Sequence, residues 1–131
     1  MSGEKNLATL LKTMKPHLNK GEYVFCTVKN DNPVQFNEIL FHFREAEGIT
    51  LVLEKHIADK LGLDYSYVAS WITLTVHSSL EAVGLTAAFS TALGKENISC
   101  NVVAAYYHDH IFVELKDAEK AMIVLNRFSE D

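Results

Sequence analysis

The segment from residue 68 to residue 77 alternates between two chemical faces, and this alternation constrains the fold of the chain. One face carries Val68, Ser70, Ile72, Leu74 and Val76, and the other carries Trp71, Thr73, Thr75 and His77. Successive side chains of a β-strand point to opposite sides of a sheet, so the pattern predicts a long strand with one buried face. Such a strand needs a sheet that other elements cover on one side.

The rest of the chain supplies further strands and helices in a regular order. Apolar and β-branched runs predict strands at residues 22–28, 49–53, 98–107 and 110–115. The spacing of apolar residues predicts helices at residues 4–15, 55–61 and 85–93 and after Asp117, and Gly62 is expected to close the second of them. Strands that alternate with helices and include one tight hairpin predict an α+β fold of ferredoxin-like βαββαβ units, with antiparallel sheets and helices on one face.

One more helix is predicted after the turn-like sequence "NDNP". Asn32 is the expected N-cap, Pro33 suits the first helical position, and Gly48 suits a left-handed end. The apolar face of this helix would consist of Phe36, Ile39, Leu40 and Phe43.

The two halves of the chain share a pattern at a fixed offset. A shift of 49 residues places "EYVFCTV" on "WITLTVH" and "EGITLVL" on "ENISCNV". The same shift places the helical face after Pro33 on Leu85, Ala88, Phe89 and Ala92. This repeat predicts a tandem duplication, with one unit at residues 1–63, including the leading helix, and the other at residues 64–131. Chance is the alternative, because any two βαβ units share such periodicity.

The cluster His108-Asp109-His110 suggests either a metal site or the tip of a hairpin. Tyr107 and His110 can pair across a two-residue turn formed by His108 and Asp109. His108 would then lie at the tip and His110 on the strand, so the two imidazoles would not share one face as a strand-borne metal pair does. A metal site also needs a third ligand at a suitable spacing. The sequence therefore favours a hairpin tip and no metal.

Composition and motifs exclude several classes of function. The chain has 131 residues and a net charge of -5, and its twelve basic residues are scattered, which argues against nucleic-acid binding. We find neither a signal peptide nor an apolar run that could span a membrane, so we expect a cytoplasmic protein in which Cys26 and Cys100 are reduced. No nucleophile motif or nucleotide-binding loop is present. We therefore expect no catalytic residues, no cofactor and no enzymatic activity.

Part of the sequence resembles a known family. The run "VGLTAAFSTALGKENISCNVVAAYYHDHIFVELKDAEKAMIVL", with the strand before it, resembles an ACT domain, a ligand-binding module of amino-acid-responsive regulators. The chain from about residue 10 to residue 129 resembles an uncharacterised bacterial family with two such units in tandem. Two departures stand out: Val83 occupies a position that is often proline in ACT units, and no final strand follows Phe128. The resemblance implies that the other half or a partner chain completes the sheet.

The resemblance implies an effector site beside the loop between the first strand and the first helix. Unpaired backbone N–H groups at a helix N-terminus suit a carboxylate, and Gly84 permits close approach to the backbone. The implied ligand-binding residues are His77, Ser78, Ser79, Glu81, Val83, Gly84, Leu85 and Asn101, and the matching place in the first half is Asn30, Asp31 and Asn32. The alternatives are a solvated loop for the serines and Glu81, and a strand-end role for Asn101.

The resemblance therefore implies a regulatory or sensor protein that binds an amino acid and acts as a homodimer. Ligand binding would shift a conformational equilibrium. The alternative is a structural or protein-interaction module that keeps the fold and has lost ligand binding. Trp71, Thr73 and Thr75 on the outer strand face are candidates for an oligomer interface.

Overall fold

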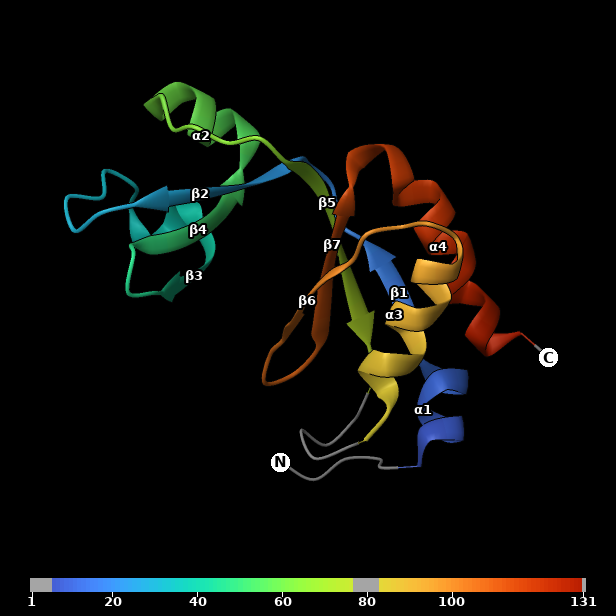
Figure 1. Cartoon of the computed structure of the whole chain (residues 1–131). Coiled ribbons are helices and arrows are strands. Elements are labelled where there is room, and N and C mark those ends of the chain that lie inside the picture. Colours follow the sequence, from blue (N-terminus) through green and yellow to red (C-terminus); the bar gives the residue numbers. More distant parts are fainter. Residues whose placement is uncertain (1–5, 77–82, 131) are drawn as a thin grey trace. The chain divides into compact units, whose positions relative to one another are not determined.

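The computed structural model describes residues 6–76 and 83–130, and the chain forms two compact units (Figure 1). The smaller unit is Lys20–Ser70, and the larger unit consists of Met1–Asn19 and Trp71–Asp131. Strand β5 (Val68–Thr75) runs from one unit into the other. The predicted boundary after residue 63 refers to the sequence repeat and stays a prediction. The compact units divide differently, because the leading segment joins the second half of the chain.

The smaller unit is an antiparallel sheet covered by one helix. Strand β2 (Tyr23–Val28) pairs with β4 (Ile49–Glu54), β4 pairs with β3 (Ile39–Arg44), and β2 also pairs with the beginning of β5. Helix α2 (Lys55–Leu61) ends at Gly62, whose φ of 70° is left-handed, as predicted. The core of this unit is Val24, Cys26, Val34, Leu51, Leu53 and Ala58.

The predicted helix after Pro33 is wrong. A single 3-10 turn, η1 (Phe36–Glu38), leads directly into strand β3. The same segment also fits a strand, since Phe41 and Phe43 recur with period two. Pairing along the edge of β4, with a register shift between Ile39 and Phe41, decides for the strand. Phe36 and Phe43 are 83% and 65% exposed, so the expected helical face is not buried.

The roles expected for two residues at the ends of that helix change accordingly. Asn32 accepts a hydrogen bond from the N–H of Val34 at 2.8 Å, which forms a local turn rather than a helix cap. Gly48 does not have a positive φ. A Cβ at Gly48 would lie 3.0 Å from Thr27 Oγ1 and 3.1 Å from the Val28 carbonyl oxygen, so a close backbone approach explains this glycine.

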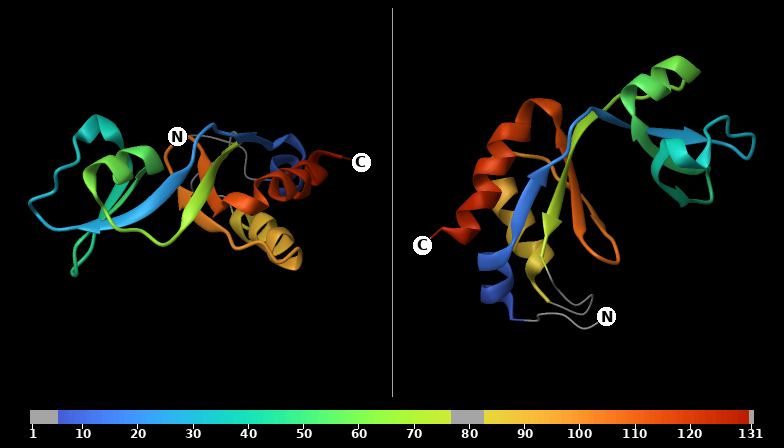
Figure 2. Two further views of the ribbon diagram at one scale, coloured as in Figure 1. Left: turned by 90° about the horizontal axis from the view of Figure 1, so that it is seen from above. Right: turned by 180° about the vertical axis from the view of Figure 1, so that it is seen from behind.

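The larger unit has three α-helices on one side of its strands among its described residues. Its elements are α1 (Leu7–Thr13), β1 (Lys15–Leu18), the rest of β5, α3 (Leu85–Lys95), β6 (Asn101–Ala104), β7 (Asp109–Glu114), η2 (Leu115–Asp117), α4 (Ala118–Asn126) and η3 (Arg127–Ser129). Figure 2 shows α3 and α4 on the same side of the sheet. The core contains Leu10 and Met14 from the leading segment, Ile72 and Leu74 from β5, Phe89 and Leu93 from α3, Ile111 and Val113 from β7, and Ala121 and Leu125 from α4.

Strand β1 supplies the strand that the sequence lacks after Phe128. It pairs antiparallel with β5, from Lys15 opposite Thr75 to Leu18 opposite Ile72. The order in the larger unit is β1-β5-β7-β6, and in the smaller unit it is β5-β2-β4-β3. Both orders are the same arrangement of four strands across the sheet. Counted along the repeating βαββαβ pattern, β5 takes the place of the last strand in the smaller unit and of the first strand in the larger one. Strand β1 takes the place of the last strand in the larger unit. The start of the chain therefore completes the sheet of the second repeat.

The structure bears out two equivalent units and corrects how their parts correspond. The shift of 49 residues places η1 and β3 on helix α3, so it equates a strand with a helix. Strands β4 and β7 correspond instead, since each buries three consecutive residues: Leu51, Val52 and Leu53 in β4, and Ile111, Phe112 and Val113 in β7. Each of these strands is followed by a helix with a buried alanine, which is Ala58 in α2 (Lys55–Leu61) and Ala118 in α4 (Ala118–Asn126).

The hairpin between β6 and β7 differs from the predicted one. Ala104 lies opposite Asp109 and Val103 lies opposite His110, so the turn consists of residues 105–108. The N–H of Ala105 donates to the carbonyl oxygen of His108 at 3.0 Å. His108 and His110 have ring centres 6.2 Å apart. Within residues 6–76 and 83–130, no group of three or more His, Cys, Asp or Glu side chains is placed to hold a metal ion, and no helix is long and apolar enough to cross a membrane.

Candidate functional site

The residues predicted to bind a ligand are only partly described by the structure. His77, Ser78, Ser79 and Glu81 lie outside the described residues. Val83 is 83% exposed, and Gly84 is the N-cap of α3 with a left-handed φ of 95°. Leu85 is buried in the core, and Asn101 is exposed at the start of β6, opposite Phe112.

Gly84 and Leu85 lie at the start of α3, whereas Asn101 lies beyond the other end of this helix, at the start of β6. Helix α3 has 11 residues and is therefore about 16 Å long. Gly84 precedes this helix and Asn101 follows it. Figure 1 shows that α3 begins near the end of β5 and that its other end leads to β6.

The leading helix lies against the glycine at the start of α3. A Cβ added to Gly84 would lie 3.1 Å from Leu7 Cδ2, and the other atoms within reach also belong to Leu7. The space that Gly84 leaves beside its backbone is therefore filled by Leu7, a side chain of the same protein. This contact joins α1 to the start of α3.

A pocket of about 760 Å³ lies where strand β5 ends. Thr75 and Val76 contribute the end of β5 and the residue after it, and Ser129 contributes the end of η3. The leading segment supplies the rest of the described lining, which consists of Thr9, Lys12, Thr13, Met14 and Lys15. The pocket thus borders the strand end from which the predicted ligand loop departs.

Two hydroxyl groups in this pocket already donate their hydrogens to the backbone. Thr13 Oγ1 donates to the carbonyl oxygen of Thr9 at 2.8 Å, and Ser129 Oγ donates to the carbonyl oxygen of Asn126 at 3.0 Å. A hydroxyl has one hydrogen, so each oxygen can now only accept hydrogen bonds from a ligand. Lys12 and Lys15 contribute cationic donors. The pocket therefore offers both acceptors and positive charge.

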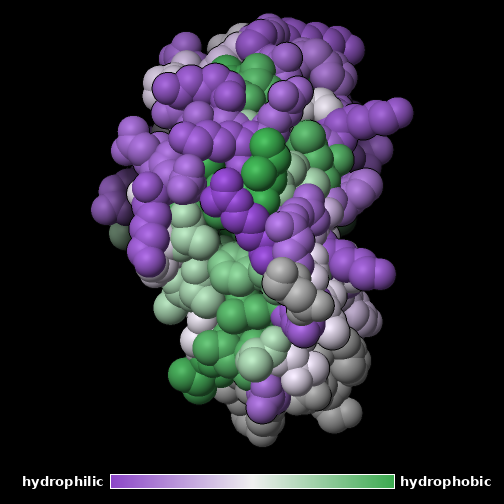
Figure 3. Space-filling model, turned by 90° about the vertical axis from the view of Figure 1, so that its right-hand side faces the viewer, coloured by the Kyte–Doolittle hydropathy of each residue, from purple (hydrophilic) through white to green (hydrophobic). Residues whose placement is uncertain are grey.

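Apolar side chains of α1, α4 and η3 form part of the surface of the larger unit. Figure 3 shows green apolar areas among purple polar side chains on the right-hand side of the molecule as drawn in Figure 1. Leu7, Leu11, Met122 and Phe128 are partly buried, and Ile123 is exposed. Exposed apolar area of this kind is a feature of surfaces that contact other molecules.

Comparison with known proteins identifies the two units. One ACT domain family model matches residues 2–70 and another matches residues 66–127. The chain belongs to the ACT domain family. Both matches include residues 66–70, where β5 begins, in agreement with a strand that serves both units. A comparison with curated proteins found no match.

Solved structures agree with this assignment. A protein of unknown function from Vibrio cholerae is 50% identical over 98% of this chain and 100% of that chain, with a TM-score of 0.84. A protein from Agrobacterium tumefaciens is 16% identical over 88% of this chain and 89% of that one, with a TM-score of 0.71. The regulatory subunit of aspartate kinase from Thermus thermophilus is 8% identical over 88% of this chain and 97% of that one, with a TM-score of 0.60, which shows a shared fold.

The pocket residues from the leading segment were not predicted from the sequence. The sequence places residues 9–15 in the first repeat, whereas the structure places them in the ACT unit formed by the second half of the chain. Ser129 comes from the last turn of the chain. The absence of a final strand after Phe128 was the available signal, because a ferredoxin-like sheet needs a fourth strand from elsewhere in the chain.

The open face of the sheet in the same ACT unit carries a hydrogen-bonded network. Trp71 Nε1 donates to His110 Nδ1 at 3.0 Å, and Thr73 Oγ1 lies 3.1 Å from the same nitrogen. Asn19 Nδ2 donates to Thr73 Oγ1 at 3.0 Å and to the Trp71 carbonyl oxygen at 3.2 Å. An indole N–H can only donate, so His110 Nδ1 must be unprotonated and the ring is neutral in this arrangement.

This network should make the stability of the protein depend on pH. Burial, and then the nearby charge of His108, lowers the pKa of His110 below its ordinary value of 6.5. The unfolded chain therefore binds a proton at a higher pH than the folded chain does, so the free energy of unfolding should fall as the pH drops below about 6.5. Urea unfolding at a series of pH values from about 7.5 to about 5.5 measures how the free energy of unfolding changes with pH.

The variant His110→Asn is the control for this prediction. Asparagine keeps an acceptor for the Trp71 N–H and does not titrate. The free energy of unfolding of this variant should therefore change less with pH than that of the wild type, between about pH 7.5 and about pH 5.5. Burial raises the pKa of Asp109, which acts in the opposite direction as the pH falls, and this contribution is common to both proteins. An equal change of the free energy of unfolding with pH in both proteins would contradict the contribution of His110 to the pH dependence.

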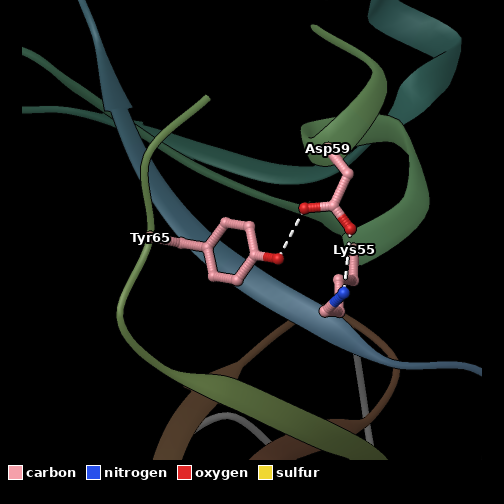
Figure 4. A network of polar contacts seen from close by, with 3 residues as sticks. All are labelled: Lys55, Asp59 and Tyr65. Atoms are coloured by element: carbon pink, nitrogen blue, oxygen red, sulfur yellow. Dashed lines mark hydrogen bonds and ion pairs between the residues drawn. The ribbon is translucent and has the colours of Figure 1, made fainter. Parts of the chain in front are cut away.

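The smaller ACT unit has a second pocket, of about 330 Å³. It is lined by Gly21, Glu22, Glu54, Lys55, His56 and Asp59. Lys55 Nζ lies 2.8 Å from Asp59 Oδ2, and the Tyr65 hydroxyl donates to Asp59 Oδ1 at 2.5 Å (Figure 4). His56 Nε2 lies 2.8 Å from Glu54 Oε2.

The charged groups of this second pocket are largely paired with one another. The hydrogen bond with Asp59 raises the pKa of Lys55, and the same bond lowers the pKa of Asp59, so both charged forms are favoured. Both side chains are exposed, and such pairs contribute little to stability. The pocket at the end of β5 is the better candidate site, because it borders the strand end from which the predicted ligand loop departs.

Proposed function

We propose that this protein is a regulatory module that binds an amino acid in the pocket at the end of β5. The observation that carries the proposal is the position of this pocket in an ACT-domain chain: it borders the exit of the first strand of the larger unit. ACT domains usually bind amino acids in regulatory proteins, and this role is regulatory rather than catalytic. The loop residues His77, Ser78, Ser79 and Glu81 stay a prediction from the resemblance.

The chemistry of the pocket supports a zwitterionic ligand. The oxygens of Thr13 and Ser129 can accept from an ammonium group, because their hydrogens are already donated to the backbone. Lys12 or Lys15 can pair with a carboxylate. The helix α1 ends at the pocket, and its C-terminal carbonyl groups also favour a positive charge.

The arrangement of the pocket suggests how binding would act. Its walls come from the leading segment, the end of β5 and the end of the chain, which are far apart in sequence. A ligand that contacts all three stabilises the state in which they are packed together and shifts the population toward it. We propose that the protein does this as a homodimer, since ACT domains often dimerise. Sedimentation with and without the ligand measures the assembly.

A thermal-shift screen against the twenty amino acids tests the proposal. A ligand at a hundred times its dissociation constant adds about 2.7 kcal/mol to the free energy of unfolding, which raises Tm by several degrees. Thr75→Phe should abolish the shift, because it places a large side chain in the pocket. Thr91→Phe is the matched control, since Thr91 is exposed on α3 and outside the lining. The absence of a shift with any amino acid would contradict the proposal.

One observation favours a second candidate function, a protein-interaction module without a ligand. The space beside Gly84 is filled by Leu7, which is the packing expected of a unit that has lost its ligand. The apolar surface of α1 and α4 then serves as the contact for a protein partner. The same screen separates the two functions, because this module shows no shift with any amino acid.

A further inference from the structure

We propose that the ligand of the pocket at the end of β5 is an amino acid with an uncharged side chain that forms hydrogen bonds, such as threonine or asparagine. This inference rests on the proposed function and specifies the class of ligand. It is carried by the bonds that each polar group of the described lining already makes, and by the positions of these groups on β1, β5 and α1.

One cationic group of the described lining is available to a ligand. Lys12 already has an interaction of its own within the chain. The ammonium group of Lys15 has no hydrogen-bond or ion-pair partner among residues 6–76 and 83–130, and no described lining residue is an Asp or a Glu. One free cation suits one carboxylate, and every amino acid carries one on its main chain. An acidic side chain would bring a second carboxylate for which the described lining holds no free cation.

The hydroxyl group of Thr75 lies beside this cation. Thr75 is directly opposite Lys15 in the ladder between β1 and β5, and both residues are exposed. Residues that are directly opposite in antiparallel strands have side chains on the same face, with Cβ atoms about 4.5–5.5 Å apart. The Thr75 hydroxyl has no hydrogen-bond partner within the described part of the chain, so its hydrogen is free for a carboxylate. Thr75 and Lys15 together therefore suit the main-chain carboxylate of the ligand.

Helix α1 supplies two further hydroxyl groups, which differ in what they can bind. Thr9 and Thr13 are four residues apart, so they lie on the same face of the helix. Thr13 Oγ1 and Ser129 Oγ already donate to the backbone and can only accept, which suits the ammonium group of the ligand. The Thr9 hydroxyl has no partner among the described residues, so it can both donate and accept. A hydroxyl or amide in the ligand side chain matches it, because such groups also do both.

Other classes of amino acid match the described lining less well. An apolar side chain would leave the Thr9 hydroxyl without a partner, and a basic one would add a cation to a pocket that holds Lys12 and Lys15. A neutral hydrogen bond contributes about 1 kcal/mol, which is about fivefold in the dissociation constant. We therefore expect L-threonine to bind about fivefold more tightly than L-valine, which has the same shape and no hydroxyl.

Calorimetric titration of the full-length protein tests this expectation with L-threonine, L-valine, L-asparagine and L-aspartate. Thr9→Val should weaken the binding of L-threonine by about fivefold and leave that of L-valine nearly unchanged. Thr91→Val is the matched control and should change neither, because Thr91 is an exposed threonine of the same unit that does not line the pocket. Unfolding midpoints of the variants verify that the fold is intact.

A second variant separates the main-chain contacts of the ligand from those of its side chain. Thr75→Val removes a donor to the carboxylate, which L-threonine and L-valine share. It should therefore weaken the binding of both ligands by the same factor, about fivefold, and leave the preference for L-threonine unchanged. The expected result is a preference for the hydroxyl that Thr9→Val removes and Thr75→Val keeps.

The other outcomes overturn different statements. If L-valine bound as tightly as L-threonine, or L-aspartate as tightly as L-asparagine, the class of ligand would be wrong and the proposed function would stay in place. A preference for L-threonine that Thr9→Val leaves intact, or that Thr91→Val reduces as much, would overturn the assignment of the side chain to Thr9. Unequal effects of Thr75→Val on the two ligands would overturn its role at the carboxylate. Binding of no amino acid at all would overturn the proposed function itself.

Discussion

Replacing Leu10 by alanine should lower the free energy of unfolding by about 2–5 kcal/mol. Leu10 lies in the leading helix and has no exposed surface, and it packs in the core of the larger unit with residues of β5, α3 and α4. Removing its side chain leaves a cavity that the surrounding core can fill only in part. Urea unfolding followed by fluorescence of Trp71, the single tryptophan of the chain and a residue of the same unit, measures the loss.

The neighbouring substitution Thr9→Ala is the control for this prediction. Thr9 is exposed on the same helix, so its replacement should change the free energy of unfolding by less than about 0.5 kcal/mol. The comparison tests whether the leading segment is part of the folded unit. Equal, small effects of the two substitutions would mean that α1 does not belong to this core.

Replacing Gly84 by alanine should destabilise the protein by about 1–2 kcal/mol. Gly84 has a φ of 95°, which is costly for a residue with a Cβ, and the new methyl group would lie 3.1 Å from Leu7 Cδ2. The substitution therefore strains the backbone at the start of α3 and also creates a short contact with Leu7 of α1. Thermal or urea unfolding measures the change.

Gly94→Ala in the same helix is the matched control and should act in the opposite direction. Gly94 lies inside α3, and a Cβ there would meet open space. Alanine in a helix interior is more favourable than glycine by about 0.5–1 kcal/mol, so this variant should be more stable than the wild type. Opposite signs for the two substitutions are the expected result. A loss of stability at both positions would mean that the strain at Gly84 is not specific to its conformation.

Some parts of the fold follow directly from local pattern. The strict alternation from Val68 onward predicts β5, and the spacing of Leu85, Phe89 and Leu93 predicts α3. Helix α2 and its end at Gly62 also follow from the sequence. In each case the period of the apolar residues and a local signal at the end agree, so a single segment contains the information. The resemblance to the ACT family is also read from the sequence alone, and it predicts the family of the protein.

Other parts depend on neighbours that are distant in the chain. The spacing of Phe36, Ile39 and Phe43 predicts a helix, whereas Phe41 and Phe43 alternate as in a strand, and pairing with β4 decides for the strand. Lys15–Leu18 is short, contains Pro16 and has no apolar period, and it is a strand because the edge of β5 is open to it. The turn of the last hairpin is longer than predicted because the pairing of Ala104 with Asp109 sets its length.

The candidate site shows the same division. The sequence predicts the glycine-started helix that follows β5. The resemblance to the ACT family implies an effector site beside that helix, which stays a prediction. Only the tertiary structure placed Lys12, Lys15 and Ser129 around one pocket, because these residues meet through the addition of β1 to the sheet and the packing of α1 on the core. Periodicity is a property of one segment, whereas the partner of a strand edge is decided by hydrogen bonding and burial across the whole fold.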